Sequence, residues 1–210
     1  MKHRQSNVQI WFLDRDLAKS AEYLTDHALE KTLDGCFAAL SCAALHFSGV
    51  RSKKAHAFLF SRERRADTMA RLFPGWPFVK PPQLRYYTSR ASRWARACRE
   101  NFDYAKSYFD ALLQEYEYRR GRRHRLAGFS DWVDSDMPAV IPAAGIAEVA
   151  LPWKNLSLKY RRRDVIEGYR LQYAHVFLWG DPLEAYASSP REVPEFVVRM
   201  FGLEGSSMVT

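Results

Sequence analysis

Cysteine is scarce in this 210-residue sequence, and its placement suits neither a disulfide framework nor a zinc site. Cys36, Cys42 and Cys98 form no Cys-x-x-Cys pair and have no histidine at the spacing of zinc ligands. A glycine-rich phosphate-binding loop is missing as well. The sequence therefore predicts no metal and no cofactor. All three cysteines lie in apolar helical patterns, which indicates small core residues in a reducing compartment.

Long hydrophobic runs are also missing. The longest apolar stretch, Cys36 to Phe47, is shorter than the roughly 20 residues that span a bilayer. The segment from Met1 to Asp14 lacks the apolar region of a signal peptide. We therefore expect no membrane partner and a cytoplasmic protein.

Acidic residues are outnumbered: 32 lysines and arginines face 24 aspartates and glutamates, giving a formal net charge of +8. The pI is about 9.5. A hydrophobic content of 47% with 14% aromatic residues excludes a disordered basic tail. The composition predicts one folded domain, residues 1–210, with an anionic partner.

The N-terminal quarter has clear element boundaries. Val8 to Leu13 has the pattern of a short strand, and Asp16 is a good N-cap for a helix through Leu24. A second helix is predicted from about Thr25, with apolar residues at helical spacing, and Gly49 ends it.

The remainder predicts further helices around a basic, irregular insertion at about residues 49–90. A short helix is expected near Arg62 to Phe73, the longest helix at Ser92 to Tyr118, and a last helix at Asp164 to Trp179. Val176 is predicted to face inward with the tyrosines of this last helix. The fold class is mainly α: a single helical domain with one or two short N-terminal or peripheral strands.

Positive charge is concentrated in three places. From Arg51 to Arg99 there are thirteen lysines and arginines against two acids, Glu63 and Asp67. Two further clusters lie at predicted helix ends, where solvated side chains or the helix dipole alone would also account for them. They comprise Arg119, Arg120, Arg122, Arg123 and Arg125, and Arg161, Arg162 and Arg163. Because arginines grip phosphates and interleaved aromatic rings can stack on bases, the pattern favours DNA as the partner.

Three segments, in chain order, carry a family resemblance. The first is Trp11 to Asp16 with Ala18, Ala21 and Asp26 to Lys31; the second is Trp94 to Arg96, Asn101, Phe102, Glu115 to Arg119, Gly121 and His124; the third is Tyr169, Arg170, Tyr173 and Arg191 to Phe196. Together they resemble a family of small phage-encoded proteins directed at pyrimidines in DNA. Its members are described as pyrimidine-dimer-glycosylase-like or as amino acid:DNA transferases of thymine hypermodification.

Two departures from the family pattern concern histidines. The family has Asp-Lys-His-Val-Val-Lys where this chain has Asp26 to Lys31, so the histidine moves by one position, which is about 100° around a helix. A His-Pro pair expected before Trp94 is Ser89-Arg90 here.

The resemblance implies a phage DNA-modifying enzyme that transfers an amino acid or amine to an activated, phosphorylated 5-hydroxymethyluracil, protecting viral DNA from host restriction. Its partners would be duplex DNA with a flipped or modified pyrimidine and an amine donor, in the cytoplasm of an infected bacterium. Cations would stabilise the departing phosphate and carboxylates would deprotonate the amine. The predicted catalytic residues are Asp14, Asp16, Asp26, Glu30 and Lys31. The predicted DNA-binding residues are Arg90, Trp94, Arg96, Asn101, Arg119, Arg122, Arg123, His124, Arg161, Arg162 and Arg163.

Two alternatives stay open. In a pyrimidine-dimer-type glycosylase and lyase, Lys31 would attack the sugar, although its acidic neighbours favour the protonated amine. In a non-catalytic DNA-binding accessory protein, Asp14 and Asp16 would serve only as turn and cap residues. The enzymatic hypotheses require Asp14, Asp26 and Lys31 to converge in one cleft, and the non-catalytic hypothesis does not.

Overall fold

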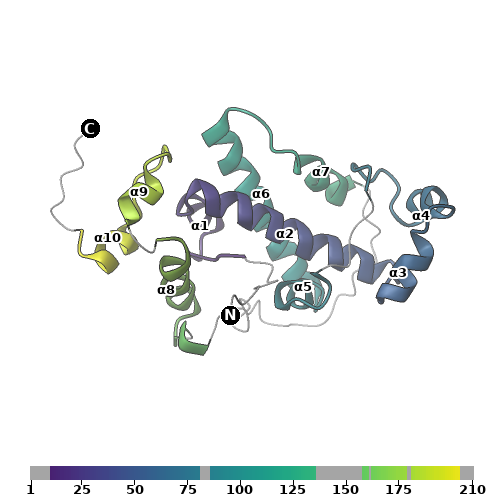
Figure 1. Cartoon of the computed structure of the whole chain (residues 1–210), viewed down its shortest axis with the longest axis horizontal. Coiled ribbons are helices and arrows are strands. Elements are labelled where there is room, and N and C mark those ends of the chain that lie inside the picture. The colour runs from purple at the N-terminus through teal and green to yellow at the C-terminus, as the bar shows by residue number, and fades with distance from the viewer. Residues whose placement is uncertain (1–9, 81–85, 136–157, 161, 179–180, 204–210) are drawn as a thin grey trace.

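The computed structural model describes residues 10–80, 86–135, 158–160, 162–178 and 181–203, and this part of the chain is mainly helical (Figure 1). No β-strand occurs among these residues. The α-helices are α1 (Leu17–Glu22), α2 (Asp26–Phe47), α3 (Lys53–Leu59), α4 (Arg65–Leu72), α5 (Arg90–Ala95), α6 (Arg99–Arg120), α7 (Ala127–Ser135), α8 (Val165–Phe177), α9 (Pro182–Tyr186) and α10 (Glu195–Phe201), and Leu158–Tyr160 forms a 3-10 turn. The predicted fold class, a single helical domain, is confirmed.

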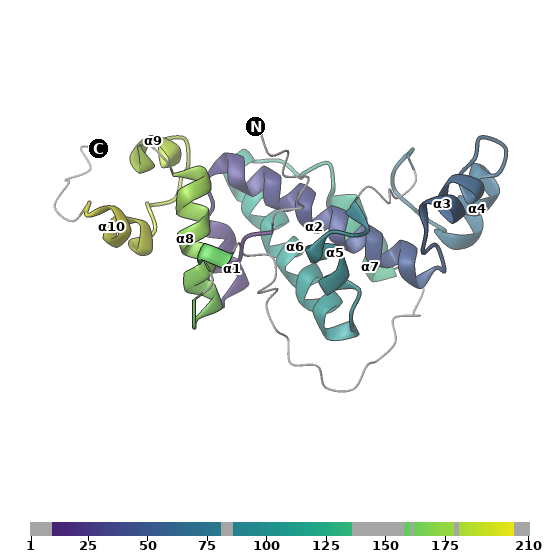
Figure 2. The ribbon, with the colours of Figure 1, turned by 60° about the horizontal axis from the view of Figure 1, so that its bottom comes forward.

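The two longest helices form the centre of the molecule. α2 packs against α6 and α5, and α1 packs against α6. In Figures 1 and 2, α3 and α4 lie at one end of the molecule, while α8, α9 and α10 lie at the other. Two helices of the predicted basic insertion, α3 and α4, therefore lie at one end of the molecule, whereas Trp76 and Phe78 pack back against Phe37 of α2.

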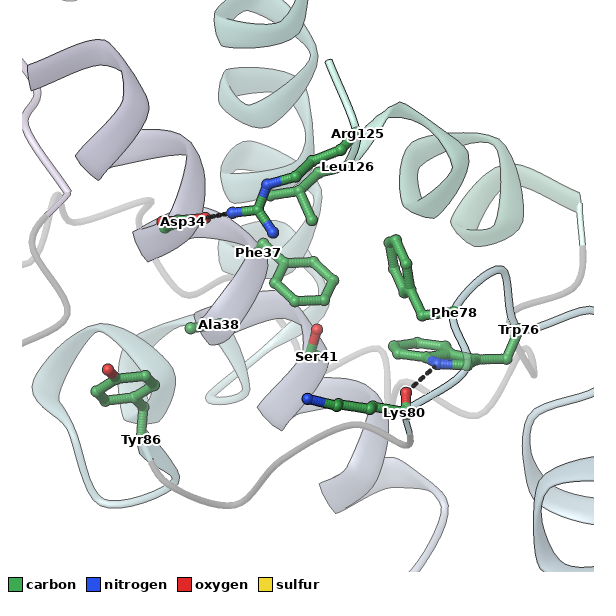
Figure 3. A pocket seen from close by; sticks show the side chains of 10 residues that line it. All are labelled: Asp34, Phe37, Ala38, Ser41, Trp76, Phe78, Lys80, Tyr86, Arg125 and Leu126. Carbon is green, nitrogen blue, oxygen red and sulfur yellow. Dashed lines mark hydrogen bonds and ion pairs between the residues drawn. The ribbon is translucent and has the colours of Figure 1, made fainter. Parts of the chain in front are cut away.

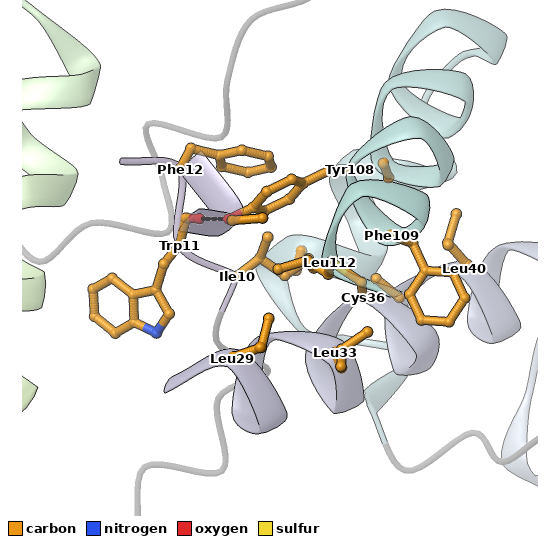
Figure 4. Close-up of a cluster of buried hydrophobic side chains, with 14 of the residues drawn as sticks. Ile10, Trp11, Phe12, Leu29, Leu33, Cys36, Leu40, Tyr108, Phe109 and Leu112 are labelled. Carbon is orange, nitrogen blue, oxygen red and sulfur yellow. Dashed lines mark hydrogen bonds between the residues drawn. The ribbon is translucent and has the colours of Figure 1, made fainter. Parts of the chain in front are cut away.

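The segment before α1 is not the strand that the sequence predicts. Residues 8 and 9 lie outside the described residues, and residues 10–13 are extended but pair with no other strand. This segment is buried between helices because Ile10, Trp11, Phe12 and Leu13 are each at most 3% exposed (Figure 4). An apolar extended run indicates burial, but it does not supply a partner strand.

Side chains replace that missing partner. The Leu13 amide donates to Ser20 Oγ at 2.8 Å, and the Arg170 Nε donates to the Leu13 carbonyl at 2.7 Å. The Tyr108 hydroxyl donates to the Trp11 carbonyl. Because buried backbone groups need hydrogen-bond partners, these contacts allow an unpaired extended segment to cross the core.

Several helix boundaries follow the predictions. Asp16 caps α1 by accepting from the amides of Ala18 and Lys19, and Thr25 caps α2. Gly49, with φ 83°, follows the end of α2, and Gly121, with φ 63°, ends α6. Both glycines adopt left-handed backbone conformations that a side chain would disfavour.

Other predictions are wrong. The single helix expected at Ser92 to Tyr118 is two helices, α5 and α6, separated by a turn at residues 96–98. Asn101 Nδ2 donates to the Trp94 carbonyl at 3.0 Å and thereby satisfies the end of α5. Val176 faces outward with 43% exposure.

The sequence predicts no helix at α3, α7, α9 or α10, which are at most nine residues long and so give a short periodic signal. The three cysteines are free and buried, as expected.

Candidate nucleic-acid interface

A row of acidic residues on one face of α2 meets a row of basic residues at the end of α6. The acids are four positions apart, so they share a helix face. The three pairs are Asp26–Arg119 at 3.0 Å, Glu30–His124 at 3.3 Å and Asp34–Arg125 at 2.7 Å. Much of the arginine cluster around Gly121 therefore holds α6 and the following turn against α2.

Arg119 lies at the centre of this ion-pair network, and its side chain is 1% exposed. It donates to Glu115 Oε1 at 2.6 Å, to the Leu24 carbonyl at 2.8 Å and to the Glu22 carbonyl at 3.0 Å. Arg191 also reaches Glu115, at 2.8 Å, from the segment before α10. Arg119 thus joins the α1–α2 corner to α6, and it offers no accessible donor to a phosphate.

His124 is the second member of the row, and it is buried against Tyr116 with ring centroids 4.6 Å apart. Burial lowers the pKa of His124, and the Glu30 carboxylate offsets this only in part. The unfolded chain therefore binds the proton more readily than the folded protein does. The stability that the neutral imidazole contributes is present above the unfolded pKa and is lost as the pH falls through that value toward the folded one.

We expect His124→Gln to reduce the loss of unfolding free energy between about pH 7.5 and about pH 5. Burial also lowers the pKa of His46, so part of the acid sensitivity should remain. Urea titrations at several pH values measure the effect. His27→Gln, at an exposed position, is the matched histidine-to-glutamine control. Identical pH dependence in the wild type and His124→Gln would contradict the assignment.

The five predicted catalytic residues have separate contacts in the structure. Asp16 is the N-cap of α1, and Asp14 accepts from Arg170 Nη2 at 3.0 Å. Asp26 and Glu30 belong to the row on α2, while Lys31 is exposed on another face of that helix. None of the five lines either of the two cavities described below.

The predicted DNA-binding residues divide by burial. Arg119, Asn101 and His124 are buried in the core or its ion pairs. Trp94 is half-buried and packs edge-on against Phe12. Arg90, Arg122, Arg123, Arg162 and Arg163 are exposed, and Arg161 lies outside the described residues. Arg123 pairs with Asp131 at 3.1 Å, and the Arg162 guanidinium donates to the Lys159 carbonyl at 3.1 Å.

Arg96 is half-buried in a cluster that the sequence did not predict. Its guanidinium lies 3.9 Å from the centre of the Tyr87 ring and donates to the Tyr87 carbonyl. The Tyr87 hydroxyl lies 2.6 Å from His46 Nδ1. This cluster ties the start of α5 to the end of α2, so Arg96 is held in place inside the most basic part of the chain.

Exposed positive charge without an ion-pair partner is concentrated between residues 51 and 93. Within the described part of the chain, no carboxylate lies within ion-pair distance of these side chains, and Glu63 and Asp67 are the local acids. The exposed cations without an ion-pair partner are Arg51, Lys53, Lys54, Arg62, Arg64, Arg65, Arg71, Lys80 and Arg93. We call this set the basic segment. The structure therefore separates the arginines around Gly121, four of which form ion pairs, from the basic segment, whose cations form none within the described residues.

A cavity of about 430 Å³ lies beside the basic segment, on the face of α2 that looks toward residues 76–80 and Tyr86 (Figure 3). Four of its lining residues lie on one face of α2, namely Asp34, Phe37, Ala38 and Ser41. The others come from the flanking segments and are Trp76, Phe78, Lys80, Tyr86, Arg125 and Leu126. We call it the aromatic pocket. The sequence shows that Asp34, Phe37, Ala38 and Ser41 share one face of a helix, because they have the i, i+3, i+4, i+7 spacing. It does not show which segment lies opposite that face.

A more open groove of about 460 Å³ runs along α4 and the residues that follow it. Arg62 and Arg65 lie on this groove, and Trp76 and Phe78 line both the groove and the aromatic pocket. The two hollows therefore share an aromatic wall, with cations of the basic segment beside each of them.

Two kinds of site find no support in the described residues. They contain no group of three or more histidine, cysteine, aspartate or glutamate side chains that could hold a metal ion. None of their helices combines the length and apolar character that crossing a membrane requires.

Comparisons with known proteins assign no family to this chain. Neither a protein-family model, nor a curated protein, nor a solved structure matches this chain. The resemblance to phage proteins directed at pyrimidines therefore stays a prediction from the sequence.

Proposed function

We propose that the protein binds DNA through the basic segment, as a non-catalytic DNA-binding protein. The observation that carries this proposal is the distribution of charge: the cations of the basic segment lack ion-pair partners within the described residues, whereas four of the five arginines around Gly121, namely Arg119, Arg120, Arg123 and Arg125, have them. Exposed lysines and arginines without ion-pair partners can neutralise phosphates and release counterions without first breaking internal pairs.

The geometry supports this function better than amine transfer or lyase chemistry. The carboxylates of Asp14 and Asp26 already accept from Arg170 and Arg119, and Asp16 holds the start of α1. Either reaction requires these acids to line one shared cleft, and none of the contacts just named forms such a cleft. Lys31 is exposed to solvent and lines neither cavity.

Salt dependence and charge reversal test the proposal. We expect labelled DNA to bind with an affinity that falls steeply between about 50 mM and about 300 mM salt. The variant Lys53→Glu, Lys54→Glu, Arg62→Glu, Arg65→Glu should bind roughly 100-fold more weakly and with a shallower salt slope. Three of these positions lie in the first turns of α3 and α4, where glutamate is compatible with the helix dipole. Fluorescence anisotropy measures both quantities.

The matched control reverses four exposed cations elsewhere on the molecule: Lys19→Glu, Lys31→Glu, Arg122→Glu and Arg163→Glu. It changes the net charge equally, so it should lower the affinity much less if the basic segment is the binding surface. Equal losses in the two variants would show that net charge alone drives binding. Absence of binding at the lowest salt would remove the proposed function altogether.

A further inference from the structure

The aromatic pocket has the shape and chemistry of a site for a flat, partly polar ring. We infer that it receives one unpaired base of a bound DNA strand, an inference that rests on the DNA-binding function proposed above. Its volume of about 430 Å³ falls within the range of small-molecule sites. The argument depends on its floor, its walls, its polar groups and its position.

The floor of the pocket is open because α2 presents small side chains there. Phe37, Ala38 and Ser41 share one face of the helix with Asp34, at spacings of three and four residues. The two small members of this stripe are Ala38 and, at its end, Ser41, with Tyr86 on one flank and Lys80 on the other (Figure 3). Larger residues at these two positions would fill the space that the aromatic side chains enclose.

The aromatic wall is fixed before any ligand arrives. The Phe37 and Phe78 rings meet edge-on with centroids 5.3 Å apart, and the Trp76 and Phe78 rings do so at 5.5 Å. Trp76 Nε1 donates to the Lys80 carbonyl at 3.0 Å, which closes the loop that carries the wall. Rings held in this way form a preorganised surface on which a base can stack, and such stacking is tolerant of sequence.

The pocket also contains polar groups suited to the edge of a base. Ser41 Oγ is buried and has no hydrogen-bond partner, and a hydroxyl both donates and accepts. At one end of the pocket, Arg125 Nη2 lies 2.7 Å from Asp34 Oδ1, which places a donor and an acceptor side by side. A base carries donors and acceptors in its ring plane, so it can supply the partner that Ser41 lacks.

The position of the pocket favours a base over an unconnected apolar molecule. Lys80 lines the pocket, and the neighbouring groove with Arg62 and Arg65 shares its Trp76 wall. A strand whose phosphates contact the basic segment would therefore pass directly over the pocket. Cations for the backbone and aromatic rings for the bases are the combination by which proteins hold single-stranded DNA.

The test compares two single-stranded oligonucleotides of about 15 residues, one of thymidines and one in which every nucleotide is abasic. They carry the same phosphates, so they differ only in their bases. We expect the wild-type protein to bind the thymidine strand about 10-fold more tightly, since base stacking contributes roughly that much for one base. Ala38→Leu should abolish this preference, while its affinity for the abasic strand stays within about 2-fold of the wild-type value.

Two further variants make the result specific to the pocket. Ala18→Leu, at an exposed alanine of α1, should keep the preference. Ser41→Ala should weaken the preference and leave the protein at least as stable, because it removes a buried hydroxyl without a partner. Equal binding of the two oligonucleotides by the wild type, or a preference that survives both Ala38→Leu and Ser41→Ala, would overturn the pocket assignment and leave DNA binding intact. Failure to bind either oligonucleotide, with no binding of labelled duplex DNA at the same salt, would overturn the proposed function instead.

Discussion

Replacing Arg119 with methionine should lower the free energy of unfolding by about 3–5 kcal/mol. The reason is the burial of its partners: the side chain of Glu115 is 4% exposed and that of Asp26 is 12% exposed. Removing the guanidinium leaves these carboxylates with less compensation and also removes the donors to two backbone carbonyls. Urea titration at neutral pH measures the change.

Two companion variants separate this effect from a general loss of positive charge. Arg122→Met removes an exposed guanidinium three residues away and should change the unfolding free energy by less than about 0.5 kcal/mol. Arg119→Lys keeps the charge but cannot serve acceptors in several directions, so its stability should lie between the wild type and Arg119→Met. If Arg119→Met and Arg122→Met were equally stable, Arg119 would not be the link between α2 and α6.

The helix ends of this protein are readable from the sequence because their causes are local. Asp16 accepts hydrogen bonds from residues two and three positions ahead, and Gly121 adopts a backbone conformation that few other residues tolerate. The long apolar stripes of α2 and α6 are equally local properties of the chain. Such features need no knowledge of what lies across the core.

Three of the arginines around Gly121 have ion-pair partners on α2, far away in the sequence. Such partners determine which cations remain free to bind a phosphate. The sequence shows acids four residues apart at Asp26 and Glu30, together with an arginine-rich helix end, but both patterns are equally compatible with solvated surfaces. Only the packing of α2 against α6 turns them into ion pairs. Counting charge along the chain therefore could not distinguish paired arginines from the unpaired cations of the basic segment.

The aromatic pocket could not be predicted from the sequence either, because its wall and its floor come from separate parts of the chain. Its wall comes from a proline-containing stretch around Trp76 that has no periodicity, and its floor comes from the middle of α2. Periodicity identifies the floor face of α2 as small and mixed in character, yet it cannot say whether solvent or another segment covers that face.

The extended segment before α1 gives the last prediction. The Phe12 ring is fully buried among aromatic neighbours, with centroid distances of 4.9 Å to Tyr108, 5.6 Å to Tyr169 and 6.0 Å to Trp94. We expect Phe12→Ala to lower the unfolding free energy by about 3–5 kcal/mol, through lost burial and the cavity that remains. Phe12→Leu should cost much less, about 1.5 kcal/mol or below, because it keeps most of the volume.

This series distinguishes the observed segment from the peripheral strand that the sequence predicts. A peripheral strand exposes one face to water, so at least one of the alanine variants of Trp11 and Phe12, whose side chains would point to opposite faces, would be mild. In the structure both side chains are at most 1% exposed, and both alanine variants should therefore be severe. Phe58→Ala, at a ring that is 59% exposed, is the control and should be nearly neutral in urea titration. A mild effect of either Trp11→Ala or Phe12→Ala would mean that the segment lies on the surface, and that the side-chain hydrogen bonds from Ser20, Tyr108 and Arg170 do not hold it inside the core.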